Sequence, residues 1–91
     1  MADSNWILIY EYVEGMVEKR TPYRTEHLAR VTAEREAGRL LIAGAYGDPP
    51  SGAVFGFKVA GREQVAAFAA GDPYVEAGLV TKQTIEPWNL V

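Results

Sequence analysis

The order of the apolar segments constrains the fold of this 91-residue chain more than any other feature. Four short stretches are rich in β-branched and aromatic residues and predict β-strands. They are WILIYEYV (6–13), RLLIAGAY (39–46), AVFGFKV (53–59) and LVTKQTIEPW (79–88). Two stretches carry apolar residues three and four positions apart and predict helices, from about Pro22 to Ala37 and over 62–70.

The resulting order is β-α-β-β-α-β, which predicts an α+β fold of the ferredoxin-like type. We expect one domain over residues 1–91, with a four-stranded antiparallel sheet and both helices on one face. Gly38 is suited to end the first helix, and GDPPSG (47–52) to join the two central strands as a hairpin loop. Residues 14–22 are expected to form a loop.

Two helices cover only one face of such a sheet, so the other face needs a partner. Residues 6–13 are apolar on both sides, with Ile7 and Ile9 pointing one way and Trp6, Leu8 and Tyr10 the other. We expect Trp6, Leu8 and Tyr10 to form an apolar patch on the open face, buried in a homodimer. The alternative is that the C-terminal tail covers this face within one chain.

Composition narrows the function classes. Apolar residues make up 48% of the chain and charged residues 23%, as in ordinary globular domains. The net charge is −3 and the nine Lys and Arg are scattered, so we expect no nucleic-acid partner. No apolar run reaches the ~20 residues of a membrane helix, and MADSNW lacks the order of a signal peptide. With no cysteine present, we expect a cytoplasmic protein.

Motifs for nucleotide or metal cofactors are missing from the sequence. There is no GxGxxG, Walker loop, HExxH or GxSxG, and one histidine without cysteine is a poor donor set for transition metals. We therefore expect no cofactor and no metal, and chemistry of the acid–base kind. His27 is the only histidine, at the border of the apolar stripe of the first helix. The sequence leaves open whether it lines a pocket or is an ordinary surface or core-edge residue.

Asp72 also has two interpretations. It precedes Pro73 at the start of DPYVEAG, a pattern typical of an N-cap followed by proline at the first helical position. A cap contributes about 1 kcal/mol, which suffices to explain an aspartate without any catalytic role. The other interpretation is that Asp72 forms a catalytic pair with His27.

Several segments taken together resemble the YCII-related protein family. They are YRTEHLARVTAEREAGRLLIAGAY (23–46), DPPSGAVFGF (48–57), DPYVEAGL (72–79) and IEPW (85–88). The family has Arg-x-x-His-Leu on a helix that leads into a Gly-rich strand end, and a later Asp-Pro-Tyr-x-x-Ala-Gly-Leu. The resemblance extends from Trp6 to Trp88 in the same order. The chain departs at Ala45, where the family commonly has proline.

This resemblance implies a ferredoxin-like subunit that dimerises sheet to sheet, as in the dimeric α+β barrel proteins. It also implies a His–Asp pair in a candidate active-site cleft, carried here by His27 and Asp72. We expect Asp72 to serve both as cap and as partner. One carboxylate oxygen is expected to accept from the amide of Tyr74 or Val75, and the other from the His27 ring. One known activity in the family is the dehydrochlorination of a chlorinated hydroxyhydroquinone. The pair favours general acid–base catalysis, in which a carboxylate orients the histidine.

Four further residues are candidates for substrate binding. Arg24 matches the family's arginine and shares a helix face with His27, and it could also be a solvated arginine. Tyr46 and Ser51 flank the hairpin loop, where both could equally be plain loop residues, and Tyr74 is suited to packing as well as to binding.

Two functions remain open at this point. The first is a small cofactor-independent enzyme, similar to a lyase, dehydrochlorinase or isomerase, that acts on a small oxygenated metabolite, either aromatic or not. The second is a non-catalytic module, either an accessory module or one that binds a small molecule in the same cleft.

Overall fold

The computed structural model describes residues 2–91, and its centre is one four-stranded sheet. The strands are β1 (Ser4–Tyr12), β2 (Leu40–Tyr46), β3 (Gly52–Val59) and β4 (Val80–Pro87). Their order across the sheet is β2-β3-β1-β4, and every neighbouring pair is antiparallel. The predicted ferredoxin-like α+β fold is confirmed.

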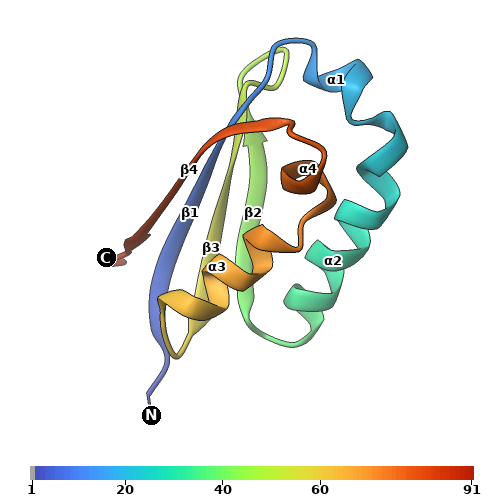
Figure 1. The fold of residues 1–91 in the computed structure, drawn as a ribbon. Coiled ribbons are helices and arrows are strands. Elements are labelled where there is room, and N and C mark those ends of the chain that lie inside the picture. The colour runs from blue at the N-terminus through green and yellow to red at the C-terminus, as the bar shows by residue number, and fades with distance from the viewer. Residues whose placement is uncertain (1) are drawn as a thin grey trace.

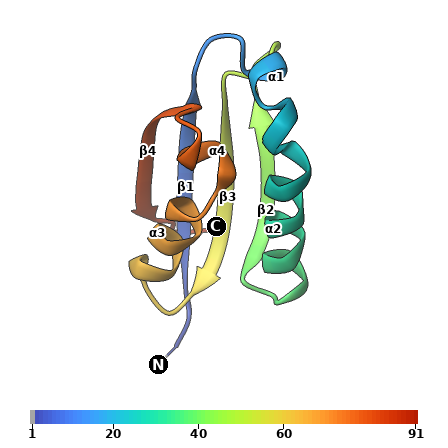
Figure 2. The same ribbon diagram turned by 45° about the vertical axis from the view of Figure 1, so that its right-hand side comes forward.

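The helices all lie on one face of this sheet, as Figures 1 and 2 show. The two longer ones are α2 (Arg24–Glu36) and α3 (Arg62–Ala70). Gly38 follows α2 with φ of +79°, a left-handed conformation that glycine adopts without strain, and it ends the helix as expected. The one-turn helix α4 (Pro73–Glu76) follows α3 after only Gly71 and Asp72.

The segment between β1 and α2 is more ordered than the sequence predicts. The expected loop over 14–22 contains a one-turn helix, α1 (Met16–Lys19). A 3₁₀ turn, η1 (Thr21–Tyr23), begins in the last two residues of that segment. The short helix is held by the side chain of Met16, which is buried against Tyr74 and Leu79. A single apolar residue carries no periodicity, which is why the sequence pattern did not predict this turn.

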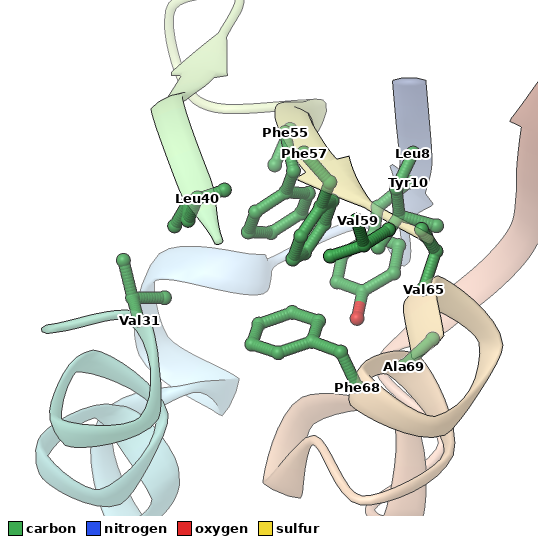
Figure 3. Packing of buried hydrophobic residues seen from close by; sticks show 11 residues of the cluster. Leu8, Tyr10, Val31, Leu40, Phe55, Phe57, Val59, Val65, Phe68 and Ala69 are labelled. Atoms are coloured by element: carbon green, nitrogen blue, oxygen red, sulfur yellow. The ribbon is translucent and has the colours of Figure 1, made fainter. Parts of the chain in front are cut away.

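The main core lies between the sheet and the helices (Figure 3). Its sheet residues include Leu8 and Tyr10, both 0% exposed, which point with Phe55 and Phe57 toward Phe68 of α3. The expectation that Leu8 and Tyr10 lie on the open face is therefore wrong, and Trp6 packs against the same helix-side core. Strand β1 is central and apolar on both faces, so its sequence does not reveal which face the helices cover.

The opposite face of β1 carries Ile7 and Ile9, which are partly exposed. Ile7 pairs in register with Gly56 of β3, which in turn pairs with Ile42 of β2. A Cβ atom added to Gly56 would meet the Trp88 ring at 2.9 Å and the Ile42 side chain at 3.0 Å. The indole of Trp88 thus lies on the open face, so the C-terminal tail covers part of it, as the alternative interpretation held.

Within residues 2–91, none of the helices combines the length and the apolar character needed to cross a lipid bilayer.

Candidate acid–base site

Asp72 stands where α3 ends and α4 begins. It is the N-cap of α4, with extended backbone, and its Oδ1 accepts a hydrogen bond from the Tyr74 amide at 3.0 Å. Pro73 follows at the first helical position, where a missing N–H costs nothing. The side chain is 0% exposed, so the carboxylate is a buried polar group that needs hydrogen-bond donors.

His27 supplies the second donor. It is near the start of α2, is 6% exposed, and its Nδ1 lies 2.8 Å from Asp72 Oδ1. The two residues are 45 positions apart in the sequence, and the packing of α2 beside α4 brings them together. Because a carboxylate only accepts hydrogen bonds, the geometry assigns the proton of the neutral ring to Nδ1.

Tyr10 supplies the third donor, which the sequence did not predict. Its hydroxyl on β1 donates to Asp72 Oδ2 at 2.9 Å. Burial, and then the adjacent Asp72 carboxylate, raise the pKa of Tyr10, so the hydroxyl keeps its proton. We expected one carboxylate oxygen to cap α4 and the other to contact His27, whereas Oδ1 does both and Oδ2 binds Tyr10.

Two aromatic side chains also hold the imidazole ring of His27 in place. It stacks on Tyr74, with ring centroids 3.9 Å apart and planes 10° from parallel, and meets Phe55 edge-on at 6.4 Å. Within residues 2–91 the one side-chain N or O atom that is fully buried without a partner is the Tyr74 hydroxyl. The Nε2 atom of His27 also makes no hydrogen bond within residues 2–91, yet it is not among the fully buried atoms. It is therefore accessible to solvent.

A cavity of about 270 Å³ adjoins His27 between α2 and β2. Its inner wall is buried and apolar or aromatic, and includes Val31, Ala53, Phe55 and Tyr74. Its remaining lining comes from the rim and from β2, and consists of Tyr12, Arg20, Arg24, Leu28, Thr32, Arg35, Ala43, Gly44 and Ala45.

Two of the four residues suggested for substrate binding line this cavity, and two do not. Arg24 is at its rim, and Tyr74 is in its wall. The structure brings neither Tyr46 nor Ser51 to it. The Tyr46 hydroxyl instead donates to the Tyr10 backbone oxygen at 3.1 Å, and Ser51 lines a separate cavity of about 530 Å³ beside α1.

Tyr10, Tyr12, Arg20 and Arg35 are the residues of this region that the sequence interpretation missed. A signal existed for Arg35, because it lies eleven residues after Arg24 and so returns to the same face of α2 after three turns. Tyr10 and Tyr12 follow Leu8 at alternate positions on β1 and share its face, but their approach to Asp72 and to the cavity depends on how the sheet packs.

The arrangement permits proton transfer at one defined atom. A proton in the cavity can move to Nε2, and the resulting imidazolium is stabilised by the Asp72 carboxylate at Nδ1. Across residues 2–91, no three His, Cys, Asp or Glu side chains gather closely enough to hold a metal ion.

Three comparisons with known proteins agree on the relationship. Residues 5–89 match the YCII-related domain. The chain is 34% identical over 84 residues to Protein YciI of Escherichia coli O6:H1, with 82% of this chain and 86% of that one covered. It is 35% identical over 95 residues to an uncharacterized protein of Haemophilus influenzae, with 94% and 97% covered.

Among solved structures, the chain is similar to 5-chloro-2-hydroxyhydroquinone dehydrochlorinase of Burkholderia phenoliruptrix AC1100, which was determined in complex with 2,5-dihydroxybenzoquinone. The TM-score is 0.80 at 18% identity, and 93% of each chain is covered, so the two proteins share the fold. The match over residues 5–89 and the identity to Protein YciI give the relationship by sequence as well. The chain belongs to the YCII-related family.

Proposed function

We propose that this protein is a small enzyme in which His27 acts as general base and general acid and Asp72 positions it. One observation carries the proposal: the only histidine is held at Nδ1 by a buried carboxylate, and its Nε2 is left accessible beside a cavity. A histidine ordinarily changes protonation near neutral pH, which suits it to both roles.

The proposed reaction begins when Nε2 takes a proton from a hydroxyl or carbon of the substrate. The electron pair that is released forms a new π bond, and either a leaving group departs with its bonding pair or the double bond moves. In the first case the imidazolium releases the proton to solvent, and in the second case it returns the proton to the substrate at another atom. Both outcomes balance without an oxidant or reductant, so the lyase or isomerase chemistry needs no cofactor.

The family and its fold support this class of reaction. The structurally similar protein from Burkholderia is named as a dehydrochlorinase of a chlorinated hydroxyhydroquinone, a small oxygenated aromatic compound. A cavity of about 270 Å³ suits a substituted six-membered ring, since a cavity of about 150 Å³ is enough for benzene.

The direct test is release of chloride from 5-chloro-2-hydroxyhydroquinone by the purified protein. We expect turnover by the wild type and a decrease of about 100- to 10,000-fold in His27→Gln, the usual size of a general acid–base contribution. Asp72→Asn is expected to decrease turnover while keeping the fold, because asparagine caps a helix about as well as aspartate. Equal rates for the wild type and His27→Gln, over a panel of related chlorinated quinols, would contradict the proposal.

A non-catalytic binding module is the second candidate, and one observation favours it. His27 joins α2 to α4 through Asp72 and stacks on Tyr74, so the same contacts could serve stability alone. If the pocket only binds a ligand, the affinity of the wild type and of His27→Gln should vary with pH in the same way through the neutral range.

We also propose that two copies of the chain pair through their open sheet faces. The support is the apolar surface formed by Ile7, Ile9, Val54, Ile42 and Trp88, of which Ile42 is 63% exposed. Toward β4 this face turns polar, with Thr84 beside Ile9.

A further inference from the structure

Arginines dominate the charge around the cavity beside His27. Arg20, Arg24 and Arg35 line it, and no aspartate or glutamate of residues 2–91 does. The whole chain has the opposite balance, with 12 acidic against 9 basic residues. Asp72 is fully buried and accepts three hydrogen bonds, and its charge also acts on Tyr12 in the cavity lining. The cavity lining is therefore richer in cationic side chains than the protein as a whole.

None of these three arginines has a carboxylate partner within residues 2–91. The ion pairs in this range join His27 to Asp72, Arg39 to Glu34 and Lys82 to Glu11. The arginine side chains that make hydrogen bonds there are Arg30 and Arg39, and neither lines this cavity. The guanidinium groups at the cavity thus retain their donors, and a guanidinium fork matches a carboxylate or another oxyanion.

Helix geometry separates the three arginines into two positions. Arg24 is one turn before His27 on α2, whereas Arg35 is two turns after it, about 12 Å along the axis. Arg24 and Arg35 are about 16 Å apart along the same axis, too far to hold one small anion together. Arg20 comes before α2 in the sequence, so it belongs with Arg24 to the part of the chain that precedes His27.

Tyr12 contributes a hydroxyl to the cavity lining, together with Arg20 and Arg24. Burial, and then the neighbouring Tyr74 and the Asp72 carboxylate, raise the pKa of Tyr12 to about 12. The charges of Arg20 and Arg24 oppose this increase in pKa. The Tyr12 hydroxyl therefore stays protonated at neutral pH and can donate a hydrogen bond in the cavity that Arg20 and Arg24 also line.

The rest of the cavity suits a flat apolar group. Its inner wall contains Phe55 and Tyr74, and its β2 side consists of the small residues Ala43, Gly44 and Ala45. A ring can lie between these two walls near His27, while a charged substituent remains at the rim.

We infer that this cavity binds a small planar ligand by an anionic oxygen, a carboxylate or a phenolate, which contacts Arg20, Arg24 and the Tyr12 hydroxyl. The ligand's use as a substrate rests on the function proposed for His27; its binding does not. The inference adds to that function a charge requirement, because a neutral ring of the same size leaves both guanidinium groups without a partner.

The test compares pairs of probes that have similar shape and different charge. Benzoate is paired with benzamide for the carboxylate, and 4-nitrophenolate with 4-nitroanisole, at mildly alkaline pH, for the phenolate. Affinities are measured by calorimetry on the full chain at low salt. We expect at least one anion to bind about tenfold or more tightly than its neutral partner, and the pair that shows this identifies the preferred oxyanion.

Variants then locate the anion. Arg20→Met and Arg24→Met should each weaken binding of that anion by about tenfold and leave binding of the neutral probe unchanged. Arg24→Lys, which keeps the charge, should restore part of the affinity. The matched control is Arg62→Met at the start of α3, which does not line the cavity and should bind as the wild type does.

The inference is overturned if no anion binds more tightly than its neutral partner, or if Arg20→Met and Arg24→Met bind the anion as the wild type does. Failure of the proposed function gives a different result. In that case His27→Gln loses no turnover, while the anion still binds in an Arg24-dependent way.

Discussion

Asp72 has no exposed surface, and each of its carboxylate hydrogen bonds comes from a different element. The Tyr74 amide comes from α4, the His27 ring from α2 and the Tyr10 hydroxyl from β1. The residue is therefore both the cap of α4 and the partner of the histidine. The sequence predicted these two contacts from the Asp-Pro pattern and the family resemblance, and could not predict Tyr10, because nothing local links β1 to the start of α4.

Replacing Tyr10 by phenylalanine tests whether that third donor stabilises the fold. The change leaves Asp72 Oδ2 buried without its donor, so we expect the free energy of unfolding to decrease by about 1–3 kcal/mol. Urea denaturation measures the effect.

Tyr74→Phe is the matched control, because the Tyr74 hydroxyl is also buried and has no hydrogen-bond partner within residues 2–91. Removing that hydroxyl should leave stability within about 0.5 kcal/mol of the wild type or increase it. Equal losses in the two variants would mean that the Tyr10 hydrogen bond contributes nothing specific.

The pKa of Tyr12 leads to a prediction at alkaline pH. The pKa is raised from 10.0 to about 12 in the folded chain, so the folded state holds this proton more tightly than the unfolded state does. The stabilisation is complete below pH 10 and is lost as pH rises from 10 to about 12. Stability measured over this range should fall less steeply in Tyr12→Phe than in the wild type, and parallel curves would contradict the assignment.

At the scale of elements, the strands and the two longer helices follow from sequence periodicity, and the short pieces do not. Helix α2 begins and ends within two residues of the segment predicted for it. Helix α3 spans the predicted range 62–70. In contrast, α1 depends on one buried residue, Met16, and the orientation of β1 depends on which of its two apolar faces the helices cover. Both require tertiary packing, which a local pattern does not contain.

Strands β1 and β2 approach each other across the start of β3 at Gly52. The Tyr46 hydroxyl reaches the Tyr10 backbone oxygen there, and a Cβ on Gly52 would collide with both the Tyr46 ring and that oxygen. We expect Gly52→Ala to lower the free energy of unfolding by about 1–3 kcal/mol or more, because backbone as well as side chain must shift.

Gly44→Ala on β2 is the control for that substitution. Apart from Gly44 itself and its two chain neighbours, residues 2–91 place no heavy atom within 4 Å of the added Cβ, so stability should stay within about 1 kcal/mol of the wild type. Thermal unfolding of the two variants compares them, and similar melting temperatures would show that the contact at Gly52 is not tight.

On the scale of the whole molecule, the two faces of the sheet differ in what covers them. The helix-side face carries the core, whereas Ile7, Ile9 and Ile42 lie on the opposite face with Trp88. The sequence predicted that one face stays open but assigned the wrong residues of β1 to it. The side chains proposed for pairing are thus the isoleucines rather than Leu8 and Tyr10.

Ile42→Glu tests the proposed pairing without touching the core. The side chain is 63% exposed, so the fold should persist while the charge blocks contact between two sheets. Sedimentation should give twice the 10.0 kDa chain mass for the wild type and the single mass for the variant. Val17→Glu, at a 40% exposed apolar residue on α1, should remain a dimer. A monomeric wild type at micromolar concentration would contradict the proposal.

The most direct test of the central claim, that Asp72 holds His27 with Nε2 free to act as the base, is ¹⁵N nuclear magnetic resonance of the labelled histidine. The chain contains one histidine, so its two ring nitrogens give an unambiguous pair of signals. In the neutral ring we expect Nδ1 to carry the proton and Nε2 to be unprotonated, and we expect Asp72→Asn to weaken this preference. A neutral ring protonated at Nε2 in the wild type would contradict the account, because the lone pair would then point at Asp72 instead of into the cavity.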